Sequence, residues 1–297
     1  MKYIAVLLTV HNRKEKTLAC LKRLYSQFFP SEYTFDVYLT DDGCTDGTPE
    51  KVTEQFPDVH IIQGDGNLYW CGGMRKAWDV AAAARNYDYY FWLNDDTFLY
   101  DFALSELLKT SANHDDKSII VGPTLSTDLK QTTYGIRMEP ERLVPPDGIE
   151  RKGDTFNGNI VLVPLYVYHI MGNIDQKLIH AGGDTEYGRT ANEKGIDVIQ
   201  TKNHLGECDL HEKLDKWCDP SVPIIERFKS MNSPKGMPLN LLFYQVRRHF
   251  GLFRAIRVVV TTVLHCAFPR LWMSGKRMII SNEKETFKFI LHLDEIA

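Results

Sequence analysis

The chain has 297 residues, of which 43% are hydrophobic and 25% are charged. This balance is that of an ordinary globular protein, and it excludes a disordered chain, a collagen and a coiled coil. The formal net charge of −4 argues against a nucleic-acid binder, because such proteins carry a strongly basic surface.

The six cysteines are scattered along the chain and form no Cys-x-x-Cys pair, so neither a zinc knuckle nor a redox motif is indicated. We expect free thiols in a reducing compartment. The apolar segment at residues 3–10 is too short for a secretory signal and has no small-residue cleavage site after it. These features predict a cytoplasmic protein.

Short apolar segments alternate with amphipathic ones from the N-terminus onward. We predict strands at residues 3–10, 35–40, 59–63, 87–93 and 118–121. We predict helices at residues 14–27, from Pro49 with Thr48 as the N-cap, at 74–85 after a glycine-rich loop, and at 102–109. This alternation predicts an α/β fold with a mostly parallel sheet that helices cover on both faces.

Acidic residues follow two of the predicted strands directly. Asp41 and Asp42 follow the second strand, and Asp95 and Asp96 follow the fourth. Ligands of parallel α/β sheets bind beyond the carboxyl ends of the strands, so both pairs are expected at one edge of the sheet. Carboxylates in this place suit a hard cation such as Mg²⁺ or Mn²⁺, the hydroxyl groups of a sugar or ribose, or both.

A turn is the alternative for each acidic pair, since Asp and Asn are common turn residues after strands. Asp41 and Asp42 in the segment DDGCTDGT are compatible with a turn alone. Asp95 and Asp96 close an apolar strand, where neighbouring carboxylates repel each other and need neutralisation. Two such pairs at one edge favour a functional site.

The charge is unevenly distributed between the two ends of the chain. Residues 224–280 contain ten Lys or Arg and one acid, Glu226, which leaves the first 223 residues acidic. We place a boundary near Pro220–Pro223 and predict a basic amphipathic helical segment at 224–297. Apolar stretches bordered by Arg and Lys, with Trp272 among them, are typical of helices on an anionic membrane. Packing on the acidic body is the alternative.

Five segments together resemble the family 2 glycosyltransferases of the GT-A fold. They are LLTVHNR, DDGCTDGT, GNLYWCGGMRKAWDVA, WLNDDT and GGDTEYGRTANEKG, in this order within residues 1–205. His11 stands where the family usually has Tyr, and Cys44 where it usually has Ser. The segment SPKGMP…FYQVRRHFG resembles the C-terminal part of a bacterial cell-surface subset of these enzymes.

The resemblance implies a GT-A catalytic domain at 1–223, with a nucleotide-sugar half at about 1–123 and an acceptor half at about 124–223. It implies inverting transfer of a sugar from a nucleotide diphosphate to an acceptor hydroxyl. The positions that match the donor-binding motifs are Thr9, His11, Asn12, Arg13, Asp41, Asp42, Gly66, Asn67, Trp70, Gly73, Arg75, Asn94 and Asp95.

The same resemblance implies that Asp184 is the catalytic base, with Gly183 and Glu186 facing the acceptor. Asp96 stands where the family holds Mg²⁺ or Mn²⁺, and His211 is a candidate to complete the metal site. Asn94 replaces a frequent Asp of the D-x-D motif.

Several of these residues have a structural alternative. Asp184 could cap a helix at residues 185–194, and His211 or His204 could be an ordinary loop histidine. We predict that Trp92, inside an apolar strand, belongs to the core. Trp70, beside two glycines, is a candidate for stacking on a sugar or a base.

The resemblance implies as partners a UDP- or dTDP-linked sugar and a glycan or polyprenyl-linked acceptor, at the inner face of the plasma membrane in bacterial surface polysaccharide assembly. A nucleotidyltransferase that makes nucleotide sugars is an alternative, although no glycine-rich loop follows the first strand. A non-catalytic sugar- or lipid-binding scaffold is another. A dinucleotide dehydrogenase is disfavoured because no GxGxxG motif follows the first strand.

Overall fold

The computed structural model describes residues 1–139, 142–210 and 214–271. Residues Met1–Met138 and Leu143–Leu210 form one compact unit. The described part of a second unit comprises Glu139, Arg142 and residues 214–271.

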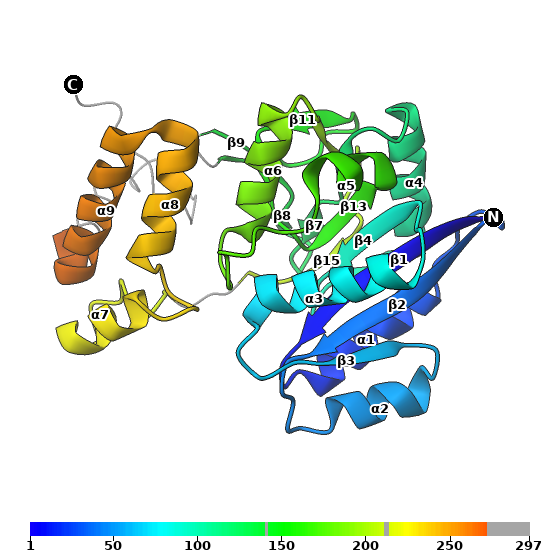
Figure 1. The fold of residues 1–297 in the computed structure, drawn as a ribbon, viewed down its shortest axis with the longest axis horizontal. Coiled ribbons are helices and arrows are strands. Elements are labelled where there is room, and N and C mark those ends of the chain that lie inside the picture. The colour runs from blue at the N-terminus through cyan, green and yellow to red at the C-terminus, as the bar shows by residue number, and fades with distance from the viewer. Residues whose placement is uncertain (140–141, 211–213, 272–297) are drawn as a thin grey trace. The chain divides into compact units, whose positions relative to one another are not determined.

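An eight-stranded sheet runs through the first unit in the order β11-β14-β6-β13-β4-β1-β2-β3 (Figure 1). Its strands are β1 (Lys2–Val10), β2 (Tyr33–Asp41), β3 (His60–Gln63), β4 (Tyr89–Leu93), β6 (Ile119–Val121), β11 (Arg151–Gly153), β13 (Ile160–Pro164) and β14 (Val198–Gln200). β1 is parallel to both β2 and β4, β2 to β3, and β14 to β6. β13 is antiparallel to β4 and β6. The prediction of a mostly parallel α/β sheet is confirmed.

Helices cover both faces of this sheet. Successive residues of a strand point to opposite faces, so a strand that is apolar throughout places apolar side chains on both. Ile4, Val6 and Leu8 of β1 belong to one buried cluster, and Ala5 and Leu7 belong to another. The first cluster includes side chains of α1 (Lys14–Tyr25), α2 (Thr48–Gln55) and α4 (Ala103–Asn113). The second includes side chains of α3 (Tyr69–Ala84), α5 (Leu165–Met171) and α6 (Gly183–Glu193).

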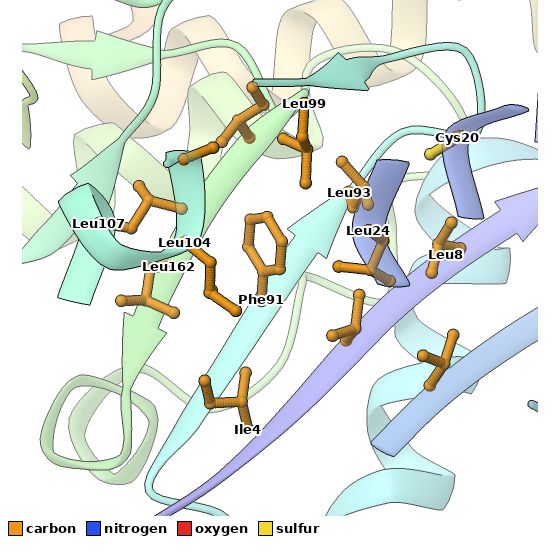
Figure 2. Packing of buried hydrophobic residues seen from close by; sticks show 14 of the residues in the cluster. Ile4, Leu8, Cys20, Leu24, Phe91, Leu93, Leu99, Leu104, Leu107 and Leu162 are labelled. Atoms are coloured by element: carbon orange, nitrogen blue, oxygen red, sulfur yellow. The ribbon is translucent and has the colours of Figure 1, made fainter. Parts of the chain in front are cut away.

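The first cluster is shown in Figure 2, where Phe91 of β4 lies between leucines of α1, α4 and β13. Trp92, the next residue, has 0% exposure and faces the opposite cluster. The prediction that Trp92 is a core residue is confirmed.

Two small sheets are present besides the eight-stranded one. One has four strands in the order β5-β15-β7-β8, with bounds β5 (Phe98–Leu99), β7 (Thr124–Leu125), β8 (Thr132–Tyr134) and β15 (Gly206–Glu207). The other has the order β10-β9-β12, with bounds β9 (Ile136–Met138), β10 (Arg142–Leu143) and β12 (Thr155–Phe156).

Two predicted helix starts are wrong. The N-cap of α2 is Gly47, and Thr48 is the first helical residue, because the Asp46 carboxylate accepts the Thr48 N–H at 3.1 Å. Helix α3 begins at Tyr69 and not at residue 74, so Trp70 and Gly73 lie on a helix and not in a loop. Local propensity disfavours glycine there. Close packing outweighs it, because a Cβ on Gly73 would lie 2.0 Å from Thr9 Oγ1.

The second unit contains the helices α7 (Ile224–Met231), α8 (Leu239–Phe250) and α9 (Leu252–Ala267), as predicted for the described part of the C-terminal segment. α8 and α9 pack through Leu242 and Val246 of α8 and Ala255 and Val258 of α9. Within the described residues, no helix combines the length and the hydropathy needed to cross a bilayer. Trp272 and the predicted tail at 272–297 lie outside the described residues.

Candidate active site

The carboxyl ends of β1, β2 and β4 meet at one edge of the sheet. Val10 lies opposite Asp41 in the parallel pair of β1 and β2. β1 also pairs with β4, where Leu7 lies opposite Trp92. The segments that follow these strands, at residues 11–13, 42–48 and 94–96, therefore come together, as predicted.

Asp42 organises the segment between β3 and α3. Its carboxylate accepts three backbone N–H groups, from Gly66 at 2.9 Å, Leu68 at 3.1 Å and Tyr69 at 2.8 Å. Asp41, which is as buried as Asp42, accepts one N–H, from Cys44 at 2.8 Å. The two aspartates thus have different surroundings, and Asp42 is the more fully engaged by the backbone.

The residues after β1 are held to the segment after β2. His11 Nδ1–H donates to the carbonyl oxygen of Asp42 at 2.6 Å. Asn12 has a φ of +53°, a left-handed conformation that non-glycine residues rarely adopt. Its Oδ1 accepts the Thr45 N–H at 2.7 Å, which stabilises this strained backbone. Strain of this kind is concentrated at functional sites.

One cation bridges the two carboxylates that follow β4. Nη1 of Arg13 donates to Asp95 Oδ1 at 3.0 Å and to Asp96 Oδ2 at 2.8 Å. Asp95 is 5% exposed. Burial raises the pKa of Asp95 to about 7. The attraction of Arg13 lowers this pKa, and the repulsion of Asp96 raises it further. The need for neutralisation that the sequence indicated is thus met by a residue 82 positions away.

The buried charge of Asp95 leads to a stability prediction. The pKa of Asp95 is about 7 in the folded protein and near 4 in the unfolded chain. At a pH between these two values, the folded protein therefore holds a proton on Asp95 that the unfolded chain has lost. Stability from this group is therefore lost as the pH rises toward 8. We expect Asp95→Asn, in metal- and nucleotide-free protein at pH 8, to raise the free energy of unfolding by about 2 to 4 kcal/mol.

Scanning calorimetry from pH 5 to pH 8 measures this effect, and the gain should shrink toward pH 5, where wild-type Asp95 is protonated. A variant that melts below the wild type at pH 8 would show that the bond to Arg13 outweighs the cost of burying the charge.

The Trp70 indole lies between Asn94, at the end of β4, and the start of α6, which carries Asp184. Its indole Nε1–H donates to Asn94 Oδ1 at 2.7 Å. A Cβ on Gly158 would lie 2.6 Å from Cζ2 of the same indole, and a Cβ on Gly183 would lie 3.5 Å from its Cζ3. Gly158 thus admits the ring, which touches the start of α6 at Gly183 and acts as a spacer between Asn94 and this helix. Trp70 is half-buried, and its stacking on a sugar or a base stays a prediction.

Asp184 lies in the first turn of α6, where the helix dipole favours a negative charge. Its Oδ2 accepts the Gly158 N–H at 2.9 Å, and its Oδ1 accepts the Thr185 N–H at 2.8 Å. Burial raises the pKa of Asp184, and these two N–H groups oppose the rise. The alternative of Asp184 as the N-cap is wrong, because α6 starts at Gly183, two residues earlier than predicted, and its N-cap is Gly182.

The remaining predicted residues lie in varied surroundings. Arg75 Nη1 donates to the carbonyl oxygens of Asp175 and Leu178, so its guanidinium holds a neighbouring loop. Asn67 is exposed. Glu186 is 3% exposed and Gly183 is buried, and their contact with an acceptor stays a prediction.

Of the two histidines that were candidate metal ligands, the structure describes His204 only. His204 Nε2 lies 2.8 Å from Thr132 Oγ1, and burial lowers its pKa. His211 lies outside the described residues.

Three residues at this site were not predicted from the sequence. Gly158 donates its N–H to Asp184, and the Asn159 carbonyl accepts the Asn94 N–H at 3.1 Å. Cys208 Sγ lies 3.9 Å from Asp96 Oδ1, and burial and the Asp96 charge raise the pKa of its thiol to about 12. The polar turn NGN just before the apolar run IVLVP was the available signal for the first two.

The carboxylates of Asp95 and Asp96 fit a hard divalent cation. Both converge on one positively charged nitrogen atom, Nη1 of Arg13, and carboxylate oxygen is the ligand that Mg²⁺ and Mn²⁺ prefer. Among the described residues, no group of three or more His, Cys, Asp or Glu could hold a metal ion. Two carboxylates with substrate phosphates suffice for Mg²⁺ in many enzymes.

Comparison with known proteins assigns the family. The family model described as "Glycosyl transferase family 2" matches residues 5–166, from β1 into α5. The chain belongs to glycosyl transferase family 2. The match includes the ends of β1, β2 and β4 and the Trp70 spacer, whereas Asp184 lies beyond it.

A curated relative is hyaluronan synthase from Streptococcus pyogenes, which is 25% identical over 173 residues. The alignment covers 56% of this family 2 chain and 40% of the relative, so the chain spans less than half the length of that protein.

Solved structures show the GT-A fold. The mannosyltransferase PcManGT from Pyrobaculum calidifontis, in complex with GDP-Man and Mn²⁺, has a TM-score of 0.57 at 14% identity, over 93% of this chain and 80% of that one. GalNAc-T7 with UDP, GalNAc and Mn²⁺ has a TM-score of 0.53 at 9% identity, over 78% and 48%. TarS from S. aureus has 0.50 at 14% identity, over 90% and 44%. The α/β prediction with the GT-A fold and C-terminal helices is confirmed.

Proposed function

We propose that the protein transfers a sugar from a nucleotide diphosphate to an acceptor hydroxyl, with inversion at the anomeric carbon. One observation carries the proposal: the Trp70 indole connects Asn94, next to the Asp95–Asp96 pair, with the start of α6, where Asp184 lies. This contact supports a site in which the Asp95–Asp96 pair serves the leaving diphosphate and the Asp184 carboxylate serves the acceptor.

In this proposal Asp184 takes the proton of the acceptor hydroxyl as the new bond forms. Its raised pKa makes it a stronger base than an exposed aspartate. A single base on the acceptor side supports one in-line displacement, which inverts the anomeric carbon. The backbone N–H groups of Gly158 and Thr185 fix the carboxylate, so its geometry is set before the substrates arrive.

The donor would bind along the edge formed by residues 9–13, Asp41 and the start of α3. We assign the contact with the base or ribose to Asp41, because three N–H groups engage the Asp42 carboxylate. Asp96, with Asp95 beside it, would hold Mg²⁺ or Mn²⁺, and such an ion neutralises the charge that develops on the leaving diphosphate. The Mn²⁺ named in two of the similar structures supports this choice.

For the acceptor we propose a glycan or a polyprenyl-linked glycan of a bacterial surface polysaccharide, used on the cytoplasmic side of the membrane. A relative named for the synthesis of hyaluronan, a polysaccharide, supports this class. So does the likeness of the C-terminal segment SPKGMP…FYQVRRHFG to enzymes of this kind.

Thermal shift with a panel of UDP-, dTDP- and GDP-sugars, each with and without Mn²⁺, tests the donor site. Saturation at a hundredfold excess over the dissociation constant adds about 2.7 kcal/mol of stability, so the melting temperature should rise for one nucleotide class. Asp41→Asn should reduce the shift, whereas Asp58→Asn, an exposed aspartate outside the site, should not.

The absence of any shift across the panel would contradict the proposal and favour a scaffold that binds no donor. Release of pyrophosphate from a nucleoside triphosphate and a sugar phosphate would instead show a nucleotidyltransferase.

A further inference from the structure

Helix α9 is apolar on two opposite faces. One face carries Ala255, Val258, Thr262 and Cys266, which are buried inside the second unit. These residues follow the helical spacing of three or four and pack against α8 and other parts of the unit.

The opposite face carries an exposed apolar stripe, which we define as Phe253, Ile256, Val260 and Leu264. Their exposures are 88%, 48%, 50% and 43%. The spacing of three, four and four residues aligns them along one side of the helix. Surface helices of globular proteins normally carry polar residues on the side that faces solvent. A row of four exposed apolar residues there indicates a surface that binds another apolar surface.

Basic residues are concentrated in α9 and at the end of α8. α9 contains no acidic residue, and Arg254 and Arg257 lie next to the stripe residues in its first turns. Arg247 and Arg248 lie in the last turn of α8, the preceding helix. Within residues 224–271, eight Lys or Arg face one acid, Glu226. This charge complements an anionic surface and would repel a second copy of the same face.

The length of α9 suits a position in the plane of an interface. Sixteen residues span about 24 Å, which is shorter than a bilayer core, and the helix carries an arginine at its third residue. An interfacial helix needs an apolar side and basic residues next to it, and α9 has both.

We propose that the stripe of α9 and the arginines of α8 and α9 bind the surface of a membrane that contains anionic lipids. The proposal rests on the proposed function in one respect, since membrane binding would bring the transfer site to a lipid-linked acceptor. The apolar side chains enter the headgroup region, and the arginines contact lipid phosphates.

Flotation of the full chain with vesicles tests this proposal. We expect binding to vesicles of phosphatidylglycerol and phosphatidylcholine, and little binding to phosphatidylcholine alone. The triple variant Phe253→Ser, Ile256→Ser, Val260→Ser should lower the partition coefficient about tenfold or more. Arg254→Gln with Arg257→Gln should lower it roughly fivefold per residue, and added salt should lower it further.

The matched control is Phe28→Ser, which removes an exposed aromatic side chain from the first unit, where its exposure is 72%. It should bind vesicles like the wild type. Circular dichroism and the donor-induced thermal shift show whether the triple variant is folded.

Equal binding of the triple variant and the wild type would overturn the proposal. So would a wild-type dimer in sedimentation equilibrium that the triple variant loses while neither protein binds vesicles, because the stripe would then join two copies. The proposed function is tested separately: Asp184→Asn should bind vesicles normally, and the triple variant should keep its donor shift.

Discussion

Asp184→Asn is expected to lower the rate of sugar transfer by about 10²- to 10⁴-fold, the contribution of a positioned general base. An amide of the same shape cannot take the proton of the acceptor hydroxyl. Donor binding should persist, because Asp95, Asp96 and the Asp42-anchored segment are unchanged. The loss should therefore appear in kcat and not in the dissociation constant of the donor.

Initial rates with a nucleotide sugar and a water-soluble acceptor, together with calorimetric titration of the donor, separate these two quantities. Asp58→Asn, an exposed aspartate in the same unit, is the matched control and should retain wild-type rates. In the wild type, the acid limb of kcat/KM should lie above the ordinary pKa of aspartate, because burial raises the pKa of Asp184. Full activity of Asp184→Asn would place the base elsewhere, with Glu186 the next residue to replace.

Loss of the metal-dependent part of donor binding is the expected result for Asp96→Ala. With wild-type protein, Mn²⁺ should strengthen donor affinity by roughly a hundredfold, since a metal at a diphosphate contributes several kcal/mol. Removing Asp96 leaves one carboxylate at the site and should reduce this gain to a small factor. Arg13 keeps its bond to Asp95, so the fold should survive.

Calorimetric titration of the donor with Mn²⁺ and with a chelator gives the gain directly for each protein. Asp58→Ala serves as the control for the loss of an aspartate charge. An unchanged gain in Asp96→Ala would contradict the assignment of the metal to this carboxylate. A reduced affinity of equal size with and without Mn²⁺ would instead show that Asp96 contacts the donor itself.

The parallel half of the sheet was predictable because its strands are local apolar runs. Residues 3–10 and 87–93 stand out as such, and a strand that ends in acids places them at the shared edge. β13 was not predicted, although it lies in the middle of the sheet between β4 and β6. Its five apolar residues are too few to distinguish a strand from a helix, and an antiparallel insertion depends on long-range pairing.

Part of the site also depends on long-range contacts and could not be predicted from the local sequence. Nothing local to Arg13 indicates that it bridges Asp95 and Asp96, which follow a different strand. The glycines near Trp70 favour a loop by propensity, but the Asp42 carboxylate accepts the N–H groups of Leu68 and Tyr69 and starts α3 early. Tertiary contacts here override the local preference.

The fit of the Trp70 ring against Gly158 makes positions 70 and 158 interdependent in sequence. Alanine at 158 collides with the indole, and a smaller residue at 70 leaves the space beside Gly158 unfilled. Either change alone should be harmful, whereas a smaller ring together with alanine at 158 could be tolerated, so their effects would not add. Exchange of sequence with related enzymes in this region should therefore transfer positions 70 and 158 together.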